Sequence, residues 1–389
     1  MHIAFLTPEY PHEKVSHAGG IGTSVKNLAI ALVEAQVQVS LFIYGQQTDE
    51  VFIEDCITFH LIKAKKYSFF TWYYYRKHIQ DYINQRIKLD SIDLVEAVDW
   101  CGITAFMNLD SQLIIRFHGS DTYFCHLEKR KQKLKNYWFE RLAVKNAQGY
   151  IAPTNFAGKL SAKLLGVNTQ KIKIIHYGLE LDKFQNSLPQ EFEEGLILYI
   201  GTIIRKKGVL ELPEIFCKVR LKYPKAHLVL IGEDTSDLKT GSTSTWRLLK
   251  ERFNSDDEQF VQYLGKIPYH EVKNYIQKAH ICVFPTFAET MGMVTIESMA
   301  LQKPVVNSDL GWAQELIDDG INGFLVYPKN HDEYAEKILS LLHNNEMRNK
   351  ICINARRKVE QDFDIGSLVW NNIQFYKKIS NEKSYKKNN

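Results

Sequence analysis

The sequence predicts an α/β protein of two doubly wound domains, each a parallel β-sheet covered by helices. Its 389 residues exceed what one ordinary hydrophobic core serves, so length alone favours two domains. Short apolar runs alternate along the chain with segments whose apolar residues recur at helical spacing. A polar stretch at residues 180–194, which contains Pro189 and an acidic cluster, separates two such series. We expect the hinge between the domains there.

The first series has the order of β-α-β units. Its strand-like apolar runs lie at residues 3–6, 37–43, 93–96, 113–117, 150–152 and 173–176. Between the first two runs, a helix is indicated by the spacing of Val25, Leu28, Ala29, Leu32 and Val33. Parallel strands that are buried on both faces read as continuous apolar runs of this kind.

The second series repeats the pattern and ends in a helix. Its strand-like runs lie at residues 196–200, 228–231, 281–284 and 304–306. The last helical pattern is carried by Leu368, Val369, Ile373 and Tyr376, and the residues after it are rich in Lys, Asn and Ser. We therefore expect an N-terminal domain at 1–185, a C-terminal domain at 186–362, a helix at 363–380 that packs back on the N-terminal domain, and a disordered tail at 381–389.

Composition limits the partners and the compartment. A net charge of +4 with 24% charged residues gives no reason to expect a nucleic-acid partner. The six cysteines are scattered without a C-x-x-C pair, which is typical of reduced thiols. The first residues have no cationic region, and their apolar run is too short for a signal peptide or a membrane span. These features predict a cytoplasmic protein.

Two glutamates mark the strongest candidate site. Glu289 and Glu297 flank a turn at Gly292 that follows the strand-like run 281–284 and leads into a predicted helix at 294–301. Ligands of open α/β sheets bind beyond the carboxyl ends of the strands, where the next helix offers N–H groups to phosphate. Ionised carboxylates accept hydrogen bonds from sugar hydroxyls. A nucleotide sugar suits this combination, whereas a helix with an N-terminal glutamate favoured by its dipole is the ordinary alternative.

Three further segments carry groups suited to the same ligand. Gly19, Gly20, Ile21 and Gly22 lie between the first strand and a helix expected to begin near Thr23, and glycine lets the backbone approach a phosphate closely. Arg205, Lys206 and Lys207 follow the run 196–200 and are suited to stabilising the charge on a departing diphosphate. His118 follows the run 113–117, at the carboxyl end of a strand. A tight turn, a solvated basic loop and a structural histidine are the alternatives.

Together these segments resemble the family-4 retaining glycosyltransferases of GT-B fold, the glycosyl transferases group 1. The resemblance rests on the Glu-x7-Glu spacing and on segments that cover most of the chain. These are residues 17–23, 116–121, 201–208, 309–315 and 319–324. It implies two facing Rossmann-like domains with an interdomain cleft, an N-terminal domain for the acceptor and a C-terminal domain for the nucleotide-sugar donor.

The resemblance also implies roles for individual residues. His118, Glu289 and Lys207 would be catalytic, with His118 contacting the transferred sugar, and Asp121 would be a weaker contact to sugar or acceptor. Donor binding would involve Gly20, Ile21, Gly22, Arg205, Lys206, Lys207, Glu289, Met291, Gly292, Met293, Val294 and Glu297, with Glu297 on the ribose. The family retains configuration by a route in which the leaving phosphate accepts the acceptor's proton, so no protein nucleophile is assigned.

One departure from the family pattern keeps an alternative open. Thr202 stands where the family usually has arginine, while Lys207 matches the usual lysine, so a second cation would come from Arg205 or Lys206. A catalytically degenerate nucleotide-sugar-binding protein of the same fold is therefore the main alternative. A nicotinamide oxidoreductase is disfavoured because G-x-G-x-x-G is absent here. By resemblance, phosphorylases would need a pyridoxal-bearing lysine, and sugar-nucleotide epimerases lack the glutamate pair.

Metal and membrane partners complete the expectations. Asp362-Phe363-Asp364 has the D-x-D pattern of metal-dependent transferases of another fold, but it precedes a helix far from any glycine-rich turn. We expect no metal and no cofactor apart from the nucleotide-sugar co-substrate. Residues 69–77 and 129–139 mix aromatic side chains with cations, which suits either an anionic lipid interface or helices with one buried face. The expected acceptor is a glycan or a lipid-linked sugar of a surface polysaccharide or glycolipid pathway, with peripheral contact at the inner face of the membrane.

Overall fold

The computed structural model describes residues 1–387, with side chains described as far as Asn381, and it divides into two compact units. Unit 1 comprises Met1–Glu180 together with the chain from Ile365 onward, and unit 2 comprises Leu181–Asp364. The first boundary between the units lies after Glu180, slightly before residue 185, where the sequence predicts the domain boundary. The second boundary lies at the start of the last helix.

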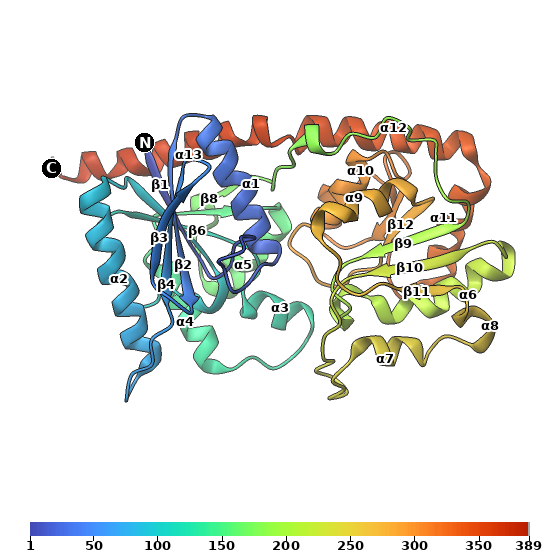
Figure 1. Cartoon of the computed structure of the whole chain (residues 1–389), viewed down its shortest axis with the longest axis horizontal. Helices are drawn as coiled ribbons and strands as arrows, with labels where there is room; N and C mark the ends of the chain where they lie inside the picture. The colour runs from blue at the N-terminus through green and yellow to red at the C-terminus, as the bar shows by residue number, and fades with distance from the viewer. Residues whose placement is uncertain (388–389) are drawn as a thin grey trace. The chain divides into compact units, whose positions relative to one another are not determined.

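An eight-stranded sheet forms the centre of unit 1 (Figure 1), in the order β3-β4-β2-β1-β5-β6-β7-β8. The strands are β1 (His2–Thr7), β2 (Gln38–Gln46), β3 (Glu50–Glu54), β4 (Ile57–Lys63), β5 (Leu94–Val98), β6 (Gln112–Arg116), β7 (Gly149–Ala152) and β8 (Ile172–Ile174). Neighbouring strands are parallel except at the edge, where β3 runs antiparallel to β4. The prediction of a parallel sheet therefore holds for all but this edge strand.

Helices cover both faces of this sheet. They are α1 (Gly20–Glu34), α2 (Thr71–Asp90), α3 (Asp121–Leu127), α4 (Leu134–Lys145), α5 (Asn155–Leu165) and α13 (Ile365–Lys387). One core cluster joins α1 and α13 to residues of β1 and β2, and a second joins α2 to residues that point to the opposite face. In Figure 1 the last helix, α13, lies beside α1. The doubly wound arrangement predicted from the alternating pattern is confirmed for this unit.

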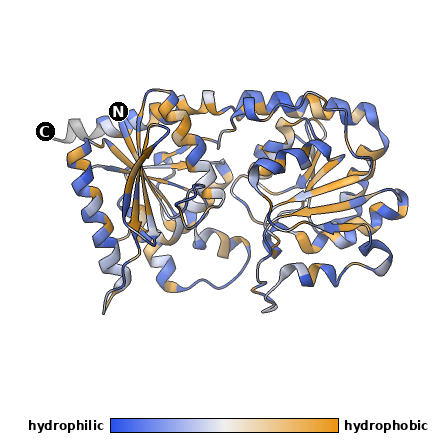
Figure 2. Ribbon diagram, viewed as in Figure 1, coloured by the Kyte–Doolittle hydropathy of each residue, from blue (hydrophilic) through white to orange (hydrophobic). Residues whose placement is uncertain are grey.

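Unit 2 has a six-stranded sheet in which all neighbours are parallel, in the order β11-β10-β9-β12-β13-β14. Its strands are β9 (Leu196–Ile200), β10 (His227–Ile231), β11 (Val261–Tyr263), β12 (Ile281–Phe284), β13 (Val305–Ser308) and β14 (Phe324–Val326). Its helices are α6 (Leu212–Lys222), α7 (Thr245–Lys250), α8 (Ser255–Glu258), α9 (Tyr269–Lys278), α10 (Met293–Ala300), α11 (His331–His343) and α12 (Asn345–Asp362). Figure 2 shows that the strands of both sheets are largely hydrophobic, as strands covered on both faces should be.

The sequence pattern missed four strands for physical reasons. Strand β3 contains Glu50 and Glu54 and is mostly exposed, so it lacks the apolar run of a buried strand. Strand β4 has polar residues among its apolar ones. Strands β11 and β14 have three residues each, which is too short for a recognisable period. Pairing with longer neighbours holds these strands in the sheets.

The C-terminal segment continues as a helix. Helix α13 extends to Lys387, whereas a disordered tail is expected over residues 381–389. Each residue added to an existing helix gains a hydrogen bond without a new nucleation cost, so a polar extension of this kind can stay helical. Residues 388 and 389 lie outside the described residues, and the expectation stays a prediction there. No helix in the described part of the chain is long and apolar enough to cross a membrane.

Candidate functional site

Two loops of unit 2 are bound to each other at the carboxyl ends of β9 and β12. Residues Arg205–Lys207 form a 3-10 turn that ends at Gly208, and the backbone carbonyl of Lys206 accepts the N–H groups of Phe287 and Ala288. Gly208 has a φ of +69°, and a Cβ atom there would lie 1.7 Å from the carbonyl oxygen of Pro285. Only glycine permits this approach. The basic loop is therefore held against the turn that carries Glu289.

Glu289 and Lys207 form an ion pair between these loops. The Lys207 ammonium donates to one carboxylate oxygen of Glu289, and the N–H of Thr290 donates to the other at 2.9 Å. Burial by itself would raise the pKa of Glu289, but the ammonium of Lys207 and the Thr290 N–H outweigh it and hold the pKa below its usual value. The structure thus brings together two residues predicted as catalytic, with the carboxylate ionised.

The turn after Glu289 leads into helix α10 through Gly292, whose φ is +90°. No side chain caps the first turn of α10, so its N–H groups point toward a potential anion. Gly292, Met293 and Val294 are partly exposed, whereas Met291 is fully buried. A ligand at this turn therefore meets the accessible surface of residues 292–294, whereas Met291 has no exposed surface in this structure.

Glu297 lies on α10 and is almost entirely buried, with 3% of its surface exposed. The hydroxyl of Tyr269, at the first residue of α9, donates to its carboxyl group at 2.6 Å. Burial raises the pKa of Glu297 to about 7, although the Tyr269 hydroxyl opposes the shift. The two glutamates of the motif therefore differ in charge near neutral pH, which their spacing alone does not predict.

Arg205 is placed differently from Lys207. Its guanidinium donates two hydrogen bonds of 2.8 Å to the carboxylate of Asp237. Asp237 is buried, and the pKa of its carboxyl is lowered by Arg205 first and by Thr240, against the effect of burial. This bidentate pair orients the basic loop, so Arg205 is engaged within the protein in addition to its predicted contact with a phosphate.

In unit 1, Gly20, Ile21 and Gly22 form the first turn of α1, and Gly19 precedes it as the N-cap residue. Helix α1 begins at Gly20, and not near Thr23 as the sequence suggested. The carboxylate of Glu9 accepts the Gly22 N–H at 2.8 Å, which stabilises an earlier helix start because a carboxylate pairs well with a helix N-terminus. Gly22 also packs on backbone, since a Cβ atom there would lie 2.9 Å from the Cα atom of Tyr10. The Gly22 N–H is therefore already bonded.

His118 follows β6 and is buried, with 8% of its surface exposed. Its Nδ1 atom lies 2.8 Å from the Tyr177 hydroxyl, and the two rings stack at a centroid distance of 5.3 Å. Burial, assisted by the nearby Arg116 guanidinium, lowers the pKa of His118 to about 3. The imidazole is therefore neutral. Its Nε2 atom is buried and has no partner among the described residues, which suits a hydrogen bond to a ligand hydroxyl.

Asp99 lies beside His118 in unit 1 and was not predicted from the sequence as a candidate residue. It follows β5, is 2% exposed, and accepts the backbone N–H of His118 through Oδ1 at 2.9 Å. Its Oδ2 atom has no partner among the described residues. Burial raises the pKa of Asp99 to about 7, although the hydrogen bond from the His118 N–H opposes this shift. Its place directly after a strand-like run, like that of His118, was the available signal.

A buried polar cluster fixes the strands that carry Asp99 and His118. Arg116 at the end of β6 forms two hydrogen bonds with Glu96 of β5, of 2.7 and 3.0 Å. Asn372 and Tyr376 of α13 complete the cluster, with Asn372 accepting from Arg116 at 2.6 Å and Tyr376 donating to Glu96 at 2.7 Å. The last helix of the chain therefore holds the two strands immediately before the site residues of unit 1.

Asp121 is engaged within unit 1. In the first turn of α3, its carboxylate accepts from Arg130 at 2.7 Å and from Asn136 at 3.1 Å. Burial alone would raise the pKa of Asp121, but these donors bring it below its usual value. The carboxylate therefore organises the segment between α3 and α4, and its predicted contact with sugar or acceptor stays a prediction.

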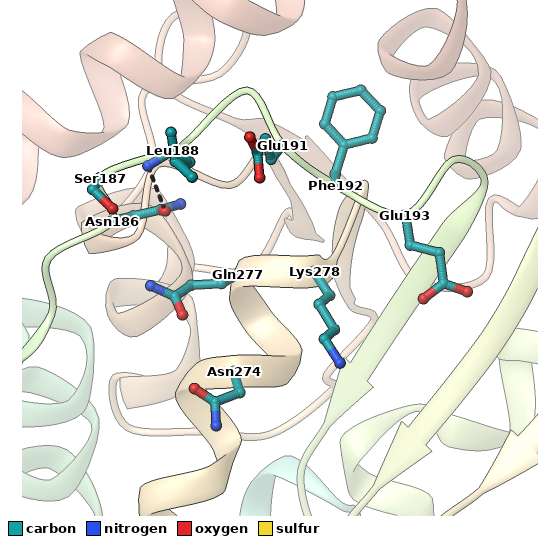
Figure 3. A pocket seen from close by; sticks show the side chains of 9 residues that line it. All are labelled: Asn186, Ser187, Leu188, Glu191, Phe192, Glu193, Asn274, Gln277 and Lys278. Atoms are coloured by element: carbon teal, nitrogen blue, oxygen red, sulfur yellow. Dashed lines mark hydrogen bonds between the residues drawn. The ribbon is translucent and has the colours of Figure 1, made fainter.

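A pocket of about 540 Å³ lies elsewhere in unit 2. It is lined by residues 186–188 and 191–193 and by the end of α9, and Figure 3 shows Asn274, Gln277 and Lys278 along its wall. The buried ammonium of Lys303 donates to the backbone carbonyls of Pro189 and Glu191 and so holds residues 189–191 in place. None of the predicted donor-binding residues lines the pocket. It is therefore a feature of the linker segment.

The D-x-D pattern does not form a metal centre. Asp362 forms an ion pair of 3.0 Å with Lys358 one turn earlier on α12, and Phe363 is completely buried. Across the described residues, no group of three or more His, Cys, Asp or Glu side chains is arranged to hold a metal ion. The pattern therefore reflects a helix end and the start of the next helix.

Two family descriptions match the chain. "Glycosyl transferases group 1" matches residues 181–358, and "Glycosyltransferase Family 4" matches residues 18–183. A relative from Methanocaldococcus jannaschii, named only as an uncharacterized glycosyltransferase, is 24% identical and covers 97% of this chain and 98% of its own. The capsular polysaccharide biosynthesis glycosyltransferase CapM of Staphylococcus aureus is 26% identical over 61% of this chain and 63% of its own.

Solved structures agree with the observed fold over nearly the full length. Sucrose-phosphate synthase from Thermosynechococcus elongatus has a TM-score of 0.77 at 20% identity and covers 97% of this chain and 98% of its own. Anabaena HepE in complex with UDP-glucose has a TM-score of 0.71 at 19% identity, with coverages of 99% and 100%. At these identities the likeness concerns the fold, which is GT-B.

Proposed function

Because this chain belongs to the glycosyl transferases group 1 and the family-4 glycosyltransferases of GT-B fold, we propose that it is a retaining, metal-independent enzyme that uses a nucleotide-diphosphate sugar. It is a glycosyltransferase, and the family uses nucleotide sugars as donors. The acceptor of this proposal is a glycan or a lipid-linked sugar.

The Lys207–Glu289 ion pair carries the proposal. It places a cation and an ionised carboxylate beside the uncapped first turn of α10. A diphosphate would bind to the cation and to the helix N–H groups, whereas sugar hydroxyls would donate hydrogen bonds to the carboxylate. A nucleotide sugar contains both kinds of group. In its absence the two residues neutralise each other.

The proposed donor contacts extend along unit 2. The diphosphate is assigned to Lys207, with Lys206 and Arg205 adding positive charge, and to the N–H groups around residues 291–294. Glu297 is assigned to the ribose hydroxyls, which would replace the Tyr269 hydroxyl as its partner. When the bond between sugar and diphosphate breaks, Lys207 stabilises the charge on the leaving oxygen.

Residues of unit 1 are assigned to the transferred sugar and the acceptor. His118 offers a neutral imidazole with an unpartnered Nε2 atom among the described residues, and this atom can bond a sugar hydroxyl. The N–H groups of Gly20 and Ile21 are assigned to the donor phosphate, while Gly22 contributes close packing. No residue is assigned as a nucleophile, since the leaving phosphate oxygen takes the acceptor proton as the new glycosidic bond forms.

The names of two relatives support a proposal for the pathway. CapM is named for capsular polysaccharide biosynthesis, and another relative, TuaC of Bacillus subtilis, for teichuronic acid biosynthesis. HepE was solved with UDP-glucose, so UDP-glucose is the first donor to try. We place the enzyme in the cytoplasm, at the inner face of the membrane, where polysaccharide precursors are assembled on lipid carriers.

One observation favours a second candidate, a nucleotide-sugar-binding protein without turnover. Thr202 replaces the usual arginine, and the guanidinium of Arg205, the nearest substitute, is bonded to Asp237. If Arg205 cannot leave Asp237, only the lysines are left to stabilise the leaving diphosphate. This candidate predicts donor binding without donor turnover.

A thermal-shift screen tests the donor site. Purified protein is heated with UDP-glucose, other UDP sugars, GDP sugars, ADP sugars and CMP sugars, each with and without EDTA. A ligand present at 100 times its Kd stabilises the folded protein by about 2.7 kcal/mol. We expect one class of donor to raise the melting temperature equally in both conditions. Slow hydrolysis of that donor to the nucleoside diphosphate then separates an enzyme from a binding protein.

Matched variants locate the response. Lys207→Ala and Glu297→Ala should abolish the shift, whereas Lys222→Ala, which removes an exposed lysine of α6, should preserve it. Lys207→Ala leaves the Glu289 carboxylate without its cation, so each variant is compared with its own ligand-free melting temperature. An unchanged shift in both site variants would place the donor elsewhere. Loss of the shift on addition of EDTA would contradict metal independence.

A further inference from the structure

Two segments of unit 1 that are far apart in the sequence expose large apolar side chains. Before and within the first turns of α2, Phe69 is 78% exposed, Phe70 65% and Tyr74 48%. In the first turns of α4, Leu134 is 77% exposed and Trp138 53%. Single exposed apolar residues are common, but a group of this size needs an explanation.

Ring contacts join the two segments into one surface. The Trp72 ring of α2 lies 5.0 Å from the Phe139 ring of α4 and 6.1 Å from the Phe70 ring. The ammonium of Lys135 lies 5.6 Å from the Trp72 ring centroid and 5.5 Å from that of Phe139. Leu134 and Trp138 flank Lys135 and are one helical turn apart. We call Phe69, Phe70, Tyr74, Leu134 and Trp138, with the lysines named below, the α2–α4 surface. Figure 1 labels the two helices that carry it.

The charge of the α2–α4 surface has one sign. Residues 63–77 and 129–139 contain no Asp or Glu. Arg130 is neutralised by Asp121 and Glu128, and the Arg76 guanidinium bonds backbone carbonyls. The lysines of the surface are Lys66, Lys129, Lys131, Lys133 and Lys135. All five are exposed, and none of them forms an ion pair within the described part of the chain.

The backbone at Phe70 adds an independent observation. Phe70 precedes α2 with φ of +48° and ψ of 40°, in the left-handed region. A bulky residue rarely adopts this conformation, because its Cβ atom crowds the following carbonyl. No core contact compensates Phe70, since its side chain is mostly exposed. Conformational strain of this kind is typical of segments that a ligand or partner selects.

We propose that the α2–α4 surface binds the protein to an anionic phospholipid bilayer. Aromatic and leucine side chains fit the boundary between headgroups and acyl chains, and lysines with their apolar stems lie along the negative headgroups. A second copy of the chain is a poorer occupant, because two identical basic surfaces would repel each other. This proposal rests on the proposed function. It adds the membrane that would present a lipid-linked acceptor to the enzyme.

Vesicle co-sedimentation tests the surface without any sugar donor. The full chain is mixed with vesicles of phosphatidylcholine alone and with vesicles that contain phosphatidylglycerol. We expect binding to the anionic vesicles that weakens as salt is raised. Lys131→Gln, Lys133→Gln and Lys135→Gln together should weaken binding on the order of 100-fold, since each basic residue near an anionic surface contributes roughly fivefold. Phe69→Ala with Phe70→Ala should weaken it at least tenfold.

Controls separate the surface from net charge and from folding. Lys145→Gln, Lys159→Gln and Lys163→Gln together remove the same charge from exposed positions of unit 1, and Leu221→Ala removes an equally exposed apolar residue of unit 2. Both controls should bind like the wild type. The melting temperature and the donor-induced shift of every variant are recorded, so that failure of the donor site is seen separately from failure of membrane binding.

Three results would overturn the proposal. Equal binding to neutral and anionic vesicles would show that the lysines do not contribute to binding. Equal loss in the surface variants and in the charge-matched control would mean that net charge alone is responsible. A concentration-dependent dimer in analytical ultracentrifugation that disappears in the Phe69→Ala, Phe70→Ala variant would assign the surface to a second copy.

Discussion

Glu297 and Asp99 share one electrostatic property although they lie in different units. Burial is the main cause that raises the pKa of each to about 7. Each has a hydroxyl or N–H donor from the protein, and within the described residues neither has a neighbouring cation that would hold it ionised, in contrast to Glu289 with Lys207. Near neutral pH these carboxyl groups can therefore change charge when a ligand binds.

The raised pKa of Glu297 predicts pH-dependent donor affinity. A protonated carboxyl accepts hydrogen bonds poorly, so the ribose hydroxyls bind better as Glu297 ionises with rising pH through about 7. We expect the affinity for the donor found in the screen to rise roughly tenfold between about pH 6 and about pH 8. Isothermal titration calorimetry at constant ionic strength measures this. Glu297→Gln should have a weak, pH-independent affinity, and an unchanged pH profile in that variant would assign the ionisation to another group.

The substitution Asp99→Asn predicts a gain of stability at high pH. A carboxyl with a raised folded-state pKa keeps its proton in the folded protein while the unfolded chain releases it. Between the ordinary pKa and about 7 the stability therefore falls as pH rises, and the Asp99→Asn variant, which has no proton to release, would not incur this loss. We expect the variant to exceed the wild type by on the order of 1–4 kcal/mol at about pH 8, and by less at about pH 5.

Urea unfolding at both pH values checks this difference. Glu297 has the same pH dependence in the variant and in the wild type, so its contribution cancels. The asparagine Oδ1 atom can still accept the His118 N–H, which keeps the histidine in place. A difference that does not grow with pH would mean that Asp99 is ionised in the folded protein. A fall in turnover in the same variant would support a ligand contact at Oδ2.

At the scale of elements, turns and helix starts hold the site in place through glycines in contact with backbone. Gly208 lets the basic loop approach the backbone of Pro285 closely, and Gly22 lets the first turn of α1 pack against the backbone of Tyr10. The glycine pattern of residues 19–22 predicts a loop for phosphate. The structure assigns packing to Gly22, while Gly20 has open space where a Cβ atom would stand.

This contrast predicts different outcomes for two similar substitutions. Gly22→Ala places a Cβ atom 2.9 Å from the Cα atom of Tyr10, so α1 must move, at a cost of about 1–3 kcal/mol. Gly20→Ala meets nothing within 4 Å and should be neutral or slightly stabilising, because alanine favours a helix. Chemical denaturation of both variants gives the comparison. Equal effects would show that the approach of α1 to Tyr10 is not specific to this glycine.

At the scale of the whole molecule, the chain returns to unit 1 at its end. Ile365, Leu368, Val369, Ile373 and Tyr376 of α13 belong to the same core cluster as α1 and β1. Asn372 and Tyr376 also complete the buried cluster around Arg116. Unit 1 therefore needs residues from both ends of the sequence, whereas unit 2 is one continuous segment.

Truncation tests this dependence. A chain that stops after Asp364 loses α13 and exposes a large apolar area of unit 1, so unit 1 should fail to fold. A chain that stops after Asn381 keeps every described core side chain of α13 and should melt like the full chain. Calorimetry should show loss of one transition in the shorter chain, and the donor-induced shift of unit 2 should be smaller than in the full chain because the proposed contacts from Gly20, Ile21 and His118 are lost. Two intact transitions would show that α13 is dispensable.

The sequence by itself determined the class of the fold and most of the candidate residues. Strands buried on both faces leave continuous apolar runs, and the Glu-x7-Glu spacing with its glycine turn is a local pattern, so neither needs tertiary information. The position after a strand-like run also singled out His118 and Lys207, and the family resemblance supplied their predicted roles. The antiparallel edge strand β3 and the early start of α1 left no such signal, since they depend on β4 and on the Glu9 carboxylate.

Only the tertiary structure decided how those residues are charged and with which residues they pair. It joined Lys207 to Glu289, tied Arg205 to Asp237, and left Asp99 and His118 each with an atom that has no partner among the described residues. It also brought the aromatic and basic segments of α2 and α4 into one surface. The reason is physical: desolvation, Coulomb interactions and ring contacts depend on distances between residues that are remote along the chain, and a linear pattern contains none of those distances.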